Sequence, residues 1–286
     1  MTKYIVIPDI KVTNANAQPV WWMISAPSLT AYAGFAHALA LKLEAKGHKG
    51  VAAVHHNIQF LGEELTNQYG GRAFLPHQFR AAGLIDKNDY PAGSMSLSSQ
   101  PTARCHLNIS LVIAMADDVK LLGTKVESFL RGARIAGGSI INHGEVVCGI
   151  ATHREALEHI RKESGKTGYS IVERQDLMKI QDQDRDMVDV VLRHTRRYAP
   201  ESKTHQNTDD NEKSESTAWV VPTCLGYAGI SPIKERSKSR KELPHLYVEP
   251  LVGLVQYSNS RDGILQFWRY THPQPNVFVL SINKEL

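Results

Sequence analysis

The chain has 286 residues, of which 42% are hydrophobic and 22% charged, and its formal net charge is +4 at pH 7. These values are typical of a globular protein with one elaborated domain, or with one domain and a large appendage. So small a net charge argues against a protein that coats nucleic acid through a broad positive field. The positive excess lies in residues 1–143, whereas the charges of residues 144–286 balance.

Cysteine usage and hydropathy exclude further classes. Cys105, Cys148 and Cys224 are far apart and odd in number, and the sequence has no Cys-x-x-Cys pair. This argues against a disulfide framework and a zinc ribbon, and we expect neither a metal nor a cofactor. The apolar run at 107–116 is much shorter than the ~20 residues that a membrane span needs. The N-terminal apolar run is also too short for a signal peptide, so we expect a cytoplasmic protein without a membrane partner.

The first predicted elements form a strand–helix–strand unit. Residues 4–12 are rich in β-branched side chains, which favour a strand. Residues 51–60 are the second strand. Between them, after Pro27, apolar residues recur at helical spacing, at Leu29, Tyr32, Ala36, Leu39 and Leu43.

Residues 61–103 interrupt this pattern with several glycines and prolines and a serine-rich run. Such a composition predicts an inserted lobe or a long loop.

A second unit follows the insertion. Residues 106–114 alternate apolar and polar side chains, which predicts a half-buried strand. Asp117 and Asp118 are candidate caps for a helix whose apolar stripe is Val119, Leu122, Val126 and Phe129. Two strand–helix–strand units predict an α+β protein with a ferredoxin-like (RRM-like, split βαβ) core over residues 1–150. This fold hosts enzymes, RNA-binding proteins and scaffolds alike.

Residues 151–286 predict an additional C-terminal α/β region packed on the core. Residues 174–197 have the pattern of an amphipathic helix, and residues 199–217 contain no large apolar side chain, which predicts a mobile polar loop. The closing strands are expected at 218–230, 245–257 and 264–282.

Two further motifs are weak. Ser164-Gly165-Lys166-Thr167 resembles the end of a phosphate-binding P-loop, but the preceding segment is charged and helical instead of a strand. His153 and His159 lack the His-Glu-x-x-His spacing of a zinc site. We expect a solvated helix surface instead of a metal site at the histidines, and no nucleotide binding at Ser164–Thr167.

The first candidate binding segment joins amides to aromatic rings. Asn14 and Asn16 lie in a run of small and amide residues that leads to Trp21 and Trp22, and Ser28 stands where a helix should begin. Amides read base edges and tryptophans stack on unpaired bases, while a helix start favours a phosphate. The alternative is a well-capped turn over two core tryptophans.

The second candidate segment combines cations with a glycine pair. Arg131 and Arg134 lead into Gly137 and Gly138, which can place charges and backbone N–H groups beside a phosphate. The alternative is a helix end followed by a bulged strand.

The third candidate segment is a basic loop between predicted strands, containing Lys234, Arg236, Lys238 and Arg240. It could clamp a nucleic-acid backbone, with an affinity that falls as salt rises. A solvated basic loop is an equally good interpretation.

Several separated blocks of the chain, in order, resemble one family. They are Ile7–Ile10 leading into Asn14-Ala15-Asn16-Ala17, Ala31–Leu39, Arg134–Ile140, Val220–Ile230 with Val248–Pro250, and Phe267–Tyr270 with Val277–Leu280. In these blocks the chain resembles the RAMP-superfamily subunit that caps the 5′ handle of guide RNA in type I-F CRISPR (Csy) surveillance complexes.

The resemblance implies a non-catalytic RNA-binding structural subunit that serves antiviral DNA interference. Such a subunit grips the crRNA 5′ handle, pairs with the large subunit and abuts the adjacent helical backbone subunit. The resemblance leaves open a contact with target DNA near the PAM end.

Two other functions remain as alternatives. In a metal-independent endoribonuclease that processes CRISPR repeat RNA, His37 or His143 would act as general base on a 2′-hydroxyl. A small-molecule enzyme on the same fold has no motif in its support.

Overall fold

The computed structural model describes residues 3–45, 47–66, 72–77, 79–82, 99–115, 123–181, 185–195, 219–235 and 243–286. The first part of the chain contains β1 (Lys3–Asn16), α1 (Leu29–Lys42), β2 (His48–Phe60), β3 (Gly62–Thr66), β4 (Arg72–Pro76), β5 (Phe79–Ala82), β6 (Ser99–Thr102), β7 (Arg104–Met115), α2 (Gly123–Leu130), β8 (Arg134–Ile135), β9 (Gly138–Asn142) and β10 (Val147–Ile150). The second part contains α3 (His153–Ser164), β11 (Tyr169–Glu173), the 3₁₀ turn η2 (Gln175–Leu177), α4 (Met187–Thr195), β12 (Val220–Gly229), β13 (Val248–Asn259), the 3₁₀ turn η3 (Ser260–Asp262), β14 (Trp268–Thr271) and β15 (Val277–Ile282).

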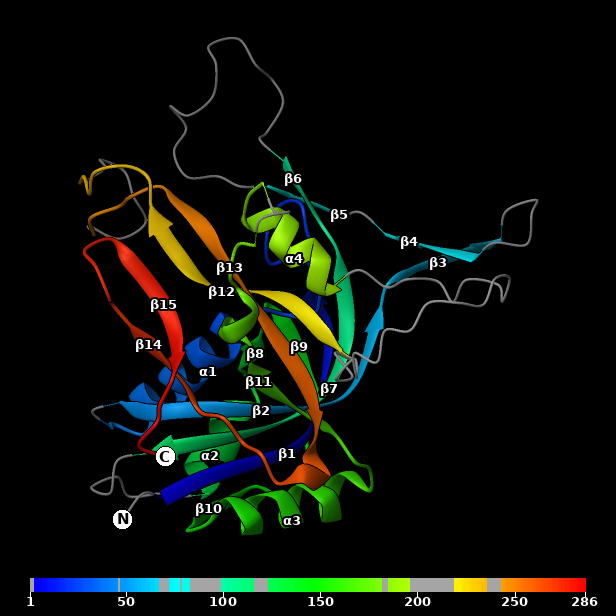
Figure 1. Cartoon of the computed structure of the whole chain (residues 1–286). Helices are drawn as coiled ribbons and strands as arrows, with labels where there is room; N and C mark the ends of the chain where they lie inside the picture. The colour runs from blue at the N-terminus through cyan, green and yellow to red at the C-terminus, as the bar shows by residue number, and fades with distance from the viewer. Residues whose placement is uncertain are drawn as a thin grey trace.

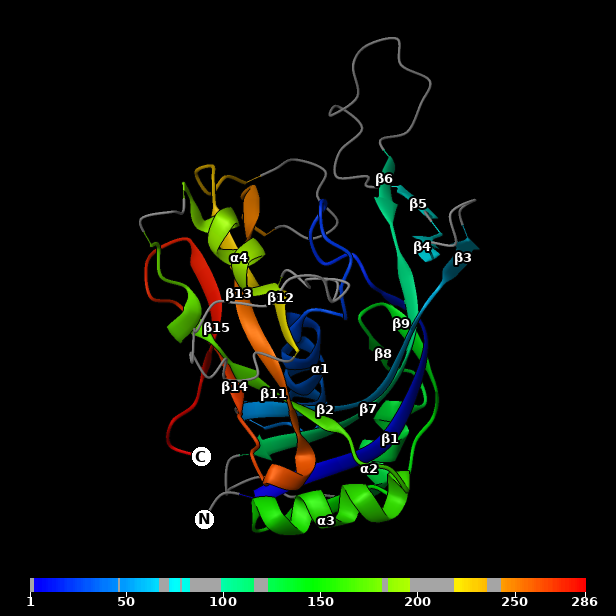
Figure 2. The same cartoon turned by 45° about the vertical axis from the view of Figure 1, so that its right-hand side comes forward.

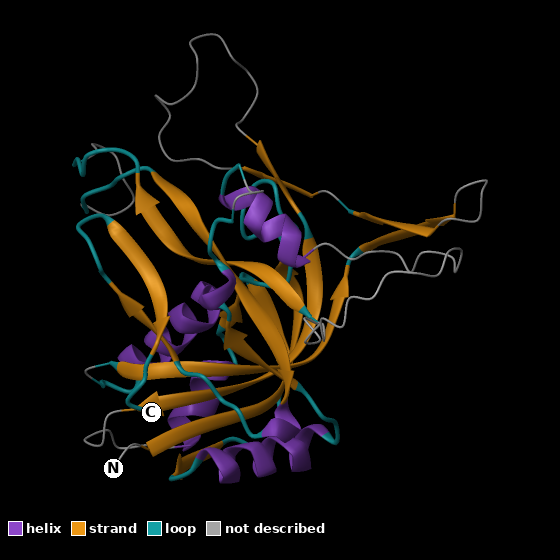
Figure 3. Ribbon diagram, viewed as in Figure 1, coloured by secondary structure: helices purple, strands orange, loops and turns teal. Residues whose placement is uncertain are grey.

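One 11-stranded antiparallel sheet organises the molecule (Figure 1). Its order is β11-β13-β12-β15-β14-β2-β7-β1-β9-β8, and β10 pairs with β1 off this path. β11 also pairs with β2, so that β2, β14, β15, β12, β13 and β11 close into a ring. Figure 3 shows the helices around this sheet. The predicted α+β class is confirmed.

Helices cover both faces of the strands β2, β7 and β1. Leu107, Ile109 and Leu111 of β7 lie in a core cluster with residues of α1 and α2. Val112 lies in a second cluster on the other face with Leu157 of α3. Figure 2 shows these strands as a layer with α1 above it and α3 along its lower side. The strand predicted over 106–114 is present, but the prediction that it is half-buried holds only at its start. From Ile109 to Met115 every residue is buried, because helices cover both faces there.

The segment between β2 and β7 leaves the main sheet. Within its described residues it forms two small sheets, β3 with β4 and β5 with β6. In Figure 1 the pair β3–β4 extends from the body on the right. The described residues of this segment therefore pair outside the main sheet, and the inserted lobe over 61–103 stays a prediction.

The helix predicted over 174–197 is wrong in its extent: among the described residues of this range, Met187–Thr195 forms the α-helix α4, and Gln175–Leu177 forms a 3₁₀ turn. The carboxylate of Asp186 accepts the backbone N–H groups of Val188 at 2.8 Å and Asp189 at 3.1 Å. An aspartate in this position starts a helix. Leu177 packs on the Val191 cluster from the turn η2 instead.

Two predicted features fall outside the described residues: the Asp117 and Asp118 caps, and the polar loop at 199–217. The division of the chain at residue 150 stays a prediction. No helix in the described ranges is both long and apolar enough to cross a membrane.

Candidate nucleic-acid interface

The end of β1 leaves regular strand geometry at Asn14. Its backbone has φ 56°, and the pairing of β1 with β7 is interrupted between Val12 and Ala15. The guanidinium of Arg104 donates to the Asn14 carbonyl oxygen at 3.0 Å. The Asn14 side chain is exposed and makes no hydrogen bond with any described residue, so its amide is free for a ligand.

Asn16 has a different role. Its side-chain oxygen accepts the backbone N–H of Gln18 and the hydroxyl of Thr102, each at 3.1 Å, and its amide nitrogen donates to the Gln18 carbonyl at 3.3 Å. These bonds fix the turn that follows β1. The predicted amide pair therefore divides into an exposed group, Asn14, and a supporting group, Asn16.

The glycine pair lies directly against this strand end. Ala136 and Gly137 have φ values of 49° and 74°, which make the sharp β8–β9 turn. A side chain at Gly138 would begin 2.6 Å from the Thr13 carbonyl oxygen and 2.8 Å from the Ala15 nitrogen, so only glycine permits this approach. The structure thus brings together the first two candidate segments.

Both arginines beside this turn are exposed. Arg131 follows α2 and Arg134 begins β8, and neither forms an ion pair with a residue in the described part of the chain. Their charges are available to an anion at the turn. The alternative interpretation, a helix end followed by a strand, describes the local structure: Arg131 directly follows α2 and Arg134 begins β8.

Trp21 and Trp22 are not core residues. Val20 and Met23 form an isolated β-bridge, and both pack on the buried Cys224. This bridge leaves the two tryptophans at the tip of the turn, 76% and 49% exposed. The alternative of a turn over two core tryptophans is therefore wrong, and the rings can stack on a partner.

Ser28 caps α1 from a buried position. Its hydroxyl accepts the Thr30 backbone N–H at 3.1 Å and donates to the Cys224 carbonyl oxygen at 2.7 Å. The structure thus gives Ser28 a folding role, and its contact with RNA stays a prediction.

Lys234 lies on the connection between β12 and β13, away from the β8–β9 turn. It exchanges two backbone hydrogen bonds with His245, at 2.9 and 2.8 Å, and its side chain is exposed. The rest of the basic loop, Arg236, Lys238 and Arg240, is outside the described residues.

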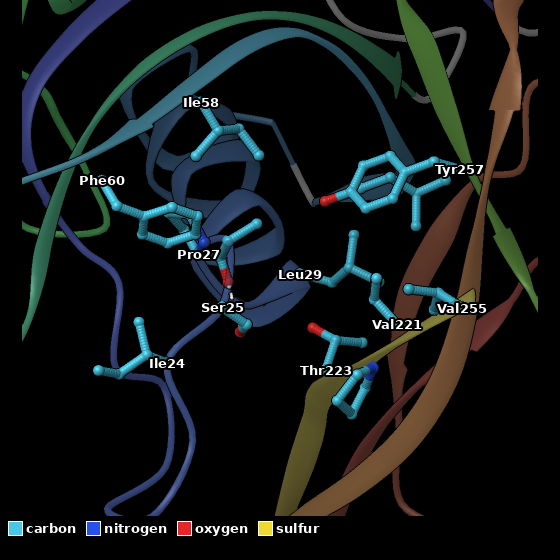
Figure 4. A pocket seen from close by; sticks show the side chains of 13 residues that line it. Ile24, Ser25, Pro27, Leu29, Ile58, Phe60, Val221, Thr223, Val255 and Tyr257 are labelled. Atoms are coloured by element: carbon cyan, nitrogen blue, oxygen red, sulfur yellow. Dashed lines mark hydrogen bonds between the residues drawn. The ribbon is translucent and has the colours of Figure 1, made fainter. Parts of the chain in front are cut away.

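An apolar hollow of about 280 Å³ opens beside the tryptophan turn (Figure 4). The segment before α1, the end of β2 and strands β11, β12 and β13 supply its walls. Figure 4 shows Phe60 on one side and Tyr257 on the other, with Leu29 between them. A second hollow of about 330 Å³ shares Ile58, Val221 and Tyr257 with the first. Sequence reasoning missed both, because their walls come from distant parts of the chain.

A buried histidine fixes the position of Tyr257, which lines both hollows. His55 hydrogen-bonds with the hydroxyl of Tyr32 at 2.9 Å and with that of Tyr257 at 3.3 Å. Burial, and next the charge of His56, lower the pKa of His55 to about 3, so its ring is neutral at physiological pH. Burial also raises the pKa of Tyr257. The neighbouring His56 hydrogen-bonds with the Ser110 hydroxyl at 2.7 Å.

The weaker motifs have structural roles. Gly165 ends α3 with φ 61°, so the Ser164–Thr167 segment follows a helix instead of preceding one. His153 hydrogen-bonds with the Tyr4 hydroxyl at 2.9 Å, and His159 with the Glu145 carbonyl oxygen at 2.7 Å. The described residues contain no group of three or more His, Cys, Asp or Glu side chains that could hold a metal ion.

The two candidate bases lie on different elements. His37 is exposed on α1. His143 follows β9, with its Nδ1 atom 2.9 Å from the Gly144 carbonyl oxygen. The structure does not bring them together into one site.

Comparison with known proteins covers nearly the whole chain. The family model described as CRISPR-associated protein (Cas_Csy2) matches residues 5–276. A relative described as CRISPR-associated protein Csy2, from Pseudomonas aeruginosa (strain UCBPP-PA14), is 22% identical over 317 residues, which cover 95% of this chain and 92% of the relative. The strand end, the glycine turn, the tryptophans and both hollows all lie within the matched residues.

Proposed function

Since the chain belongs to the Csy2 family of CRISPR-associated proteins, which places it in the type I-F Csy complex, we propose that it is a non-catalytic subunit that grips the single-stranded 5′ handle of the crRNA. In this role it pairs with the large subunit and abuts the neighbouring helical backbone subunit for antiviral DNA interference.

We also propose that strands β2, β7, β1 and β9 form a ferredoxin-like core. In chain order the four strands are β1, β2, β7 and β9. The sheet order β2-β7-β1-β9 is therefore second, third, first, fourth, which fits a split βαβ arrangement. α1 and α2 pack on one face, where Phe35 and Phe129 have ring centroids 5.3 Å apart. These contacts support the proposal.

The observation that carries RNA binding is the contact of the Gly138 turn with the end of β1. It gathers an exposed amide at Asn14, a left-handed turn that can present N–H groups, and the cations of Arg131 and Arg134. The exposed tryptophans next to this strand end offer stacking faces. Such a combination suits the binding of a few unpaired nucleotides. Binding so short a segment requires only a few local cations, which is compatible with the small net charge of this chain.

Exposed apolar side chains on projecting elements support contacts with other subunits. Phe74 and Leu75 of β4 are 47% and 56% exposed, and Val188 and Leu192 of α4 are 53% and 56% exposed. Exposed apolar groups of this kind mark protein–protein contacts when they form a patch.

The test is the double variant Arg131→Ala/Arg134→Ala, co-expressed with the other Csy subunits and a guide RNA. We expect less RNA to be retained in the purified complex. The plot of log affinity against log salt should become shallower by about 1.4, since each single-strand phosphate contact contributes about 0.7. The matched control, Arg154→Ala/Arg161→Ala, removes two exposed arginines of α3. Normal RNA retention in the first variant would refute the role of the glycine turn.

The non-catalytic part of the proposal has a separate test. Purified protein is incubated with CRISPR repeat RNA in EDTA, alone and as His37→Ala and His143→Ala variants. We expect intact RNA in every case. A discrete product that one of the histidine variants fails to make would establish an endoribonuclease instead.

A further inference from the structure

The second hollow differs from the first in having polar groups among aromatic walls. We call it the aromatic pocket: four consecutive residues of β2, His55 to Ile58, line it together with Tyr169, Trp219, Val221 and Tyr257. At about 330 Å³ it lies at the lower end of the ~300–1,000 Å³ range of small-molecule sites, so it suits one compact ring system.

Two ring walls of the pocket are held in place. Trp219 stacks on Tyr169 with centroids 4.9 Å apart and an interplanar angle of 22°, and Trp219 remains 51% exposed. The hydroxyl of Tyr257 is anchored through His55 to Tyr32 on α1. The fold already holds these rings in fixed orientations. A ligand that stacks on them therefore loses little binding free energy to the ordering of side chains.

The backbone departs from regular geometry on both sides of the pocket. The pairing of β2 with β7 shifts register between His55 and Asn57, and this bulge turns the following side chain. Trp219 has φ 76°, an uncommon conformation for a bulky residue, and its carbonyl oxygen accepts the Tyr257 N–H at 3.1 Å. Strained geometry of this kind is concentrated at ligand sites.

Asn57 is the amide among the residues that line the pocket, where the rings of His55 and His56 already hydrogen-bond with Tyr32 and Ser110. Its side chain is exposed at the pocket and makes no hydrogen bond with a described residue. An amide offers one acceptor and two donors, which match the mixed donor and acceptor edge of a nucleobase. An aliphatic side chain of a partner protein would leave this amide unused.

We propose that the aromatic pocket binds one unpaired base of the guide RNA, which stacks on Trp219 and hydrogen-bonds with Asn57. The inference rests on the proposed RNA binding and adds to it a second contact, separate from the phosphate contacts at the glycine turn. The pocket fixes the position of one nucleotide, while the turn holds the backbone.

The experiment places 2-aminopurine at successive handle positions of a guide RNA in the assembled Csy complex. Stacking quenches this fluorophore, so one position should be quenched in the wild type and should brighten in Trp219→Ala and Asn57→Ala. We expect the dissociation constant for the guide RNA to rise on the order of 10-fold in the Trp219→Ala variant, because one base loses its stacking partner. Both side chains are exposed, so both variants should fold.

Matched controls are Ile264→Ala, an exposed apolar side chain between η3 and β14, and Asn142→Ala, an exposed amide on β9. If the wild-type complex holds no RNA through this chain, the proposed function itself fails. If RNA is retained and no position responds to the pocket variants, only the base pocket is overturned. Loss of the large subunit from Trp219→Ala, with RNA retained and fluorescence unchanged, would assign the pocket to a protein side chain instead.

Discussion

The backbone N–H of Asn16 donates a hydrogen bond of 2.9 Å to the carbonyl oxygen of Ala136. This bond joins two segments that are 120 positions apart in the sequence, and it holds the β8–β9 turn against the end of β1. Thr13 pairs with Ser139 in the same ladder. This contact between the end of β1 and the β8–β9 turn therefore positions both the exposed amide of Asn14 and the charge of Arg134.

Gly138→Ala should separate the turn from β1. The added Cβ atom would lie within 2.8 Å of backbone atoms of Thr13 and Ala15, which cannot move as a flexible side chain can. We expect a loss of about 1–3 kcal/mol in the free energy of unfolding and weaker RNA retention. Gly132→Ala is the control, because a Cβ atom there meets nothing within 4 Å. Equal stability of the two variants in urea denaturation would contradict the close approach.

Trp21→Ala and Trp22→Ala should weaken RNA binding without unfolding the chain. Since both rings are largely exposed, we expect the free energy of unfolding to change by less than about 0.5 kcal/mol. The dissociation constant for handle RNA should rise on the order of 10-fold for a ring that stacks on a base. Leu41→Ala, at a residue 62% exposed on α1, controls for removal of surface apolar area. Unchanged RNA affinity in both variants would remove the tryptophans from the interface.

Local periodicity was sufficient to predict the first strand–helix–strand unit and β7. The apolar spacing from Leu29 to Leu43 is that of α1, and the alternation at the start of β7 is that of a strand with one buried face. The burial of both faces from Ile109 onward was missed, because it depends on α3. The pairing of β11 with both β13 and β2 was not predictable in this way. It depends on contacts between distant segments, such as Ser170 with Val54, which leave no local pattern.

The site was predictable only in pieces. Asn14 and Gly138 each stood out in the sequence, but their contact depends on the β1–β9 ladder. The exposure of Trp21 was decided by a two-residue bridge that buries Val20 and Met23 instead. The aromatic pocket could not be predicted, because β2, β11, β12, β13 and the turn before β12 together form it.

Ser28→Ala should destabilise the protein more than it affects RNA. The variant removes the side-chain cap of α1 and leaves the buried Cys224 carbonyl without its hydroxyl donor, which together should cost about 1–2 kcal/mol in urea denaturation. Thr152→Ala removes the cap of α3, whose bond to the Glu155 N–H is exposed, and should cost less. An RNA affinity that falls under conditions where the Ser28→Ala variant is fully folded would show that the hydroxyl contacts RNA after all.

The stability of the chain should fall as the pH is lowered from 6.5, and His55 should account for part of the slope. Its folded-state pKa is lowered to about 3, chiefly by burial, whereas an imidazole in the unfolded chain takes up a proton near pH 6.5. Between these values the unfolded state binds one more proton, so the free energy of unfolding decreases by about 1.4 kcal/mol per pH unit for this residue. In His55→Gln, which still offers hydrogen-bonding groups to Tyr32 and Tyr257, urea denaturation at a series of pH values should give a slope shallower by about that amount. His272→Gln, which removes an exposed imidazole, is the matched control. If the two variants have the same slope as the wild type, His55 is not the buried neutral group that holds the wall of the aromatic pocket.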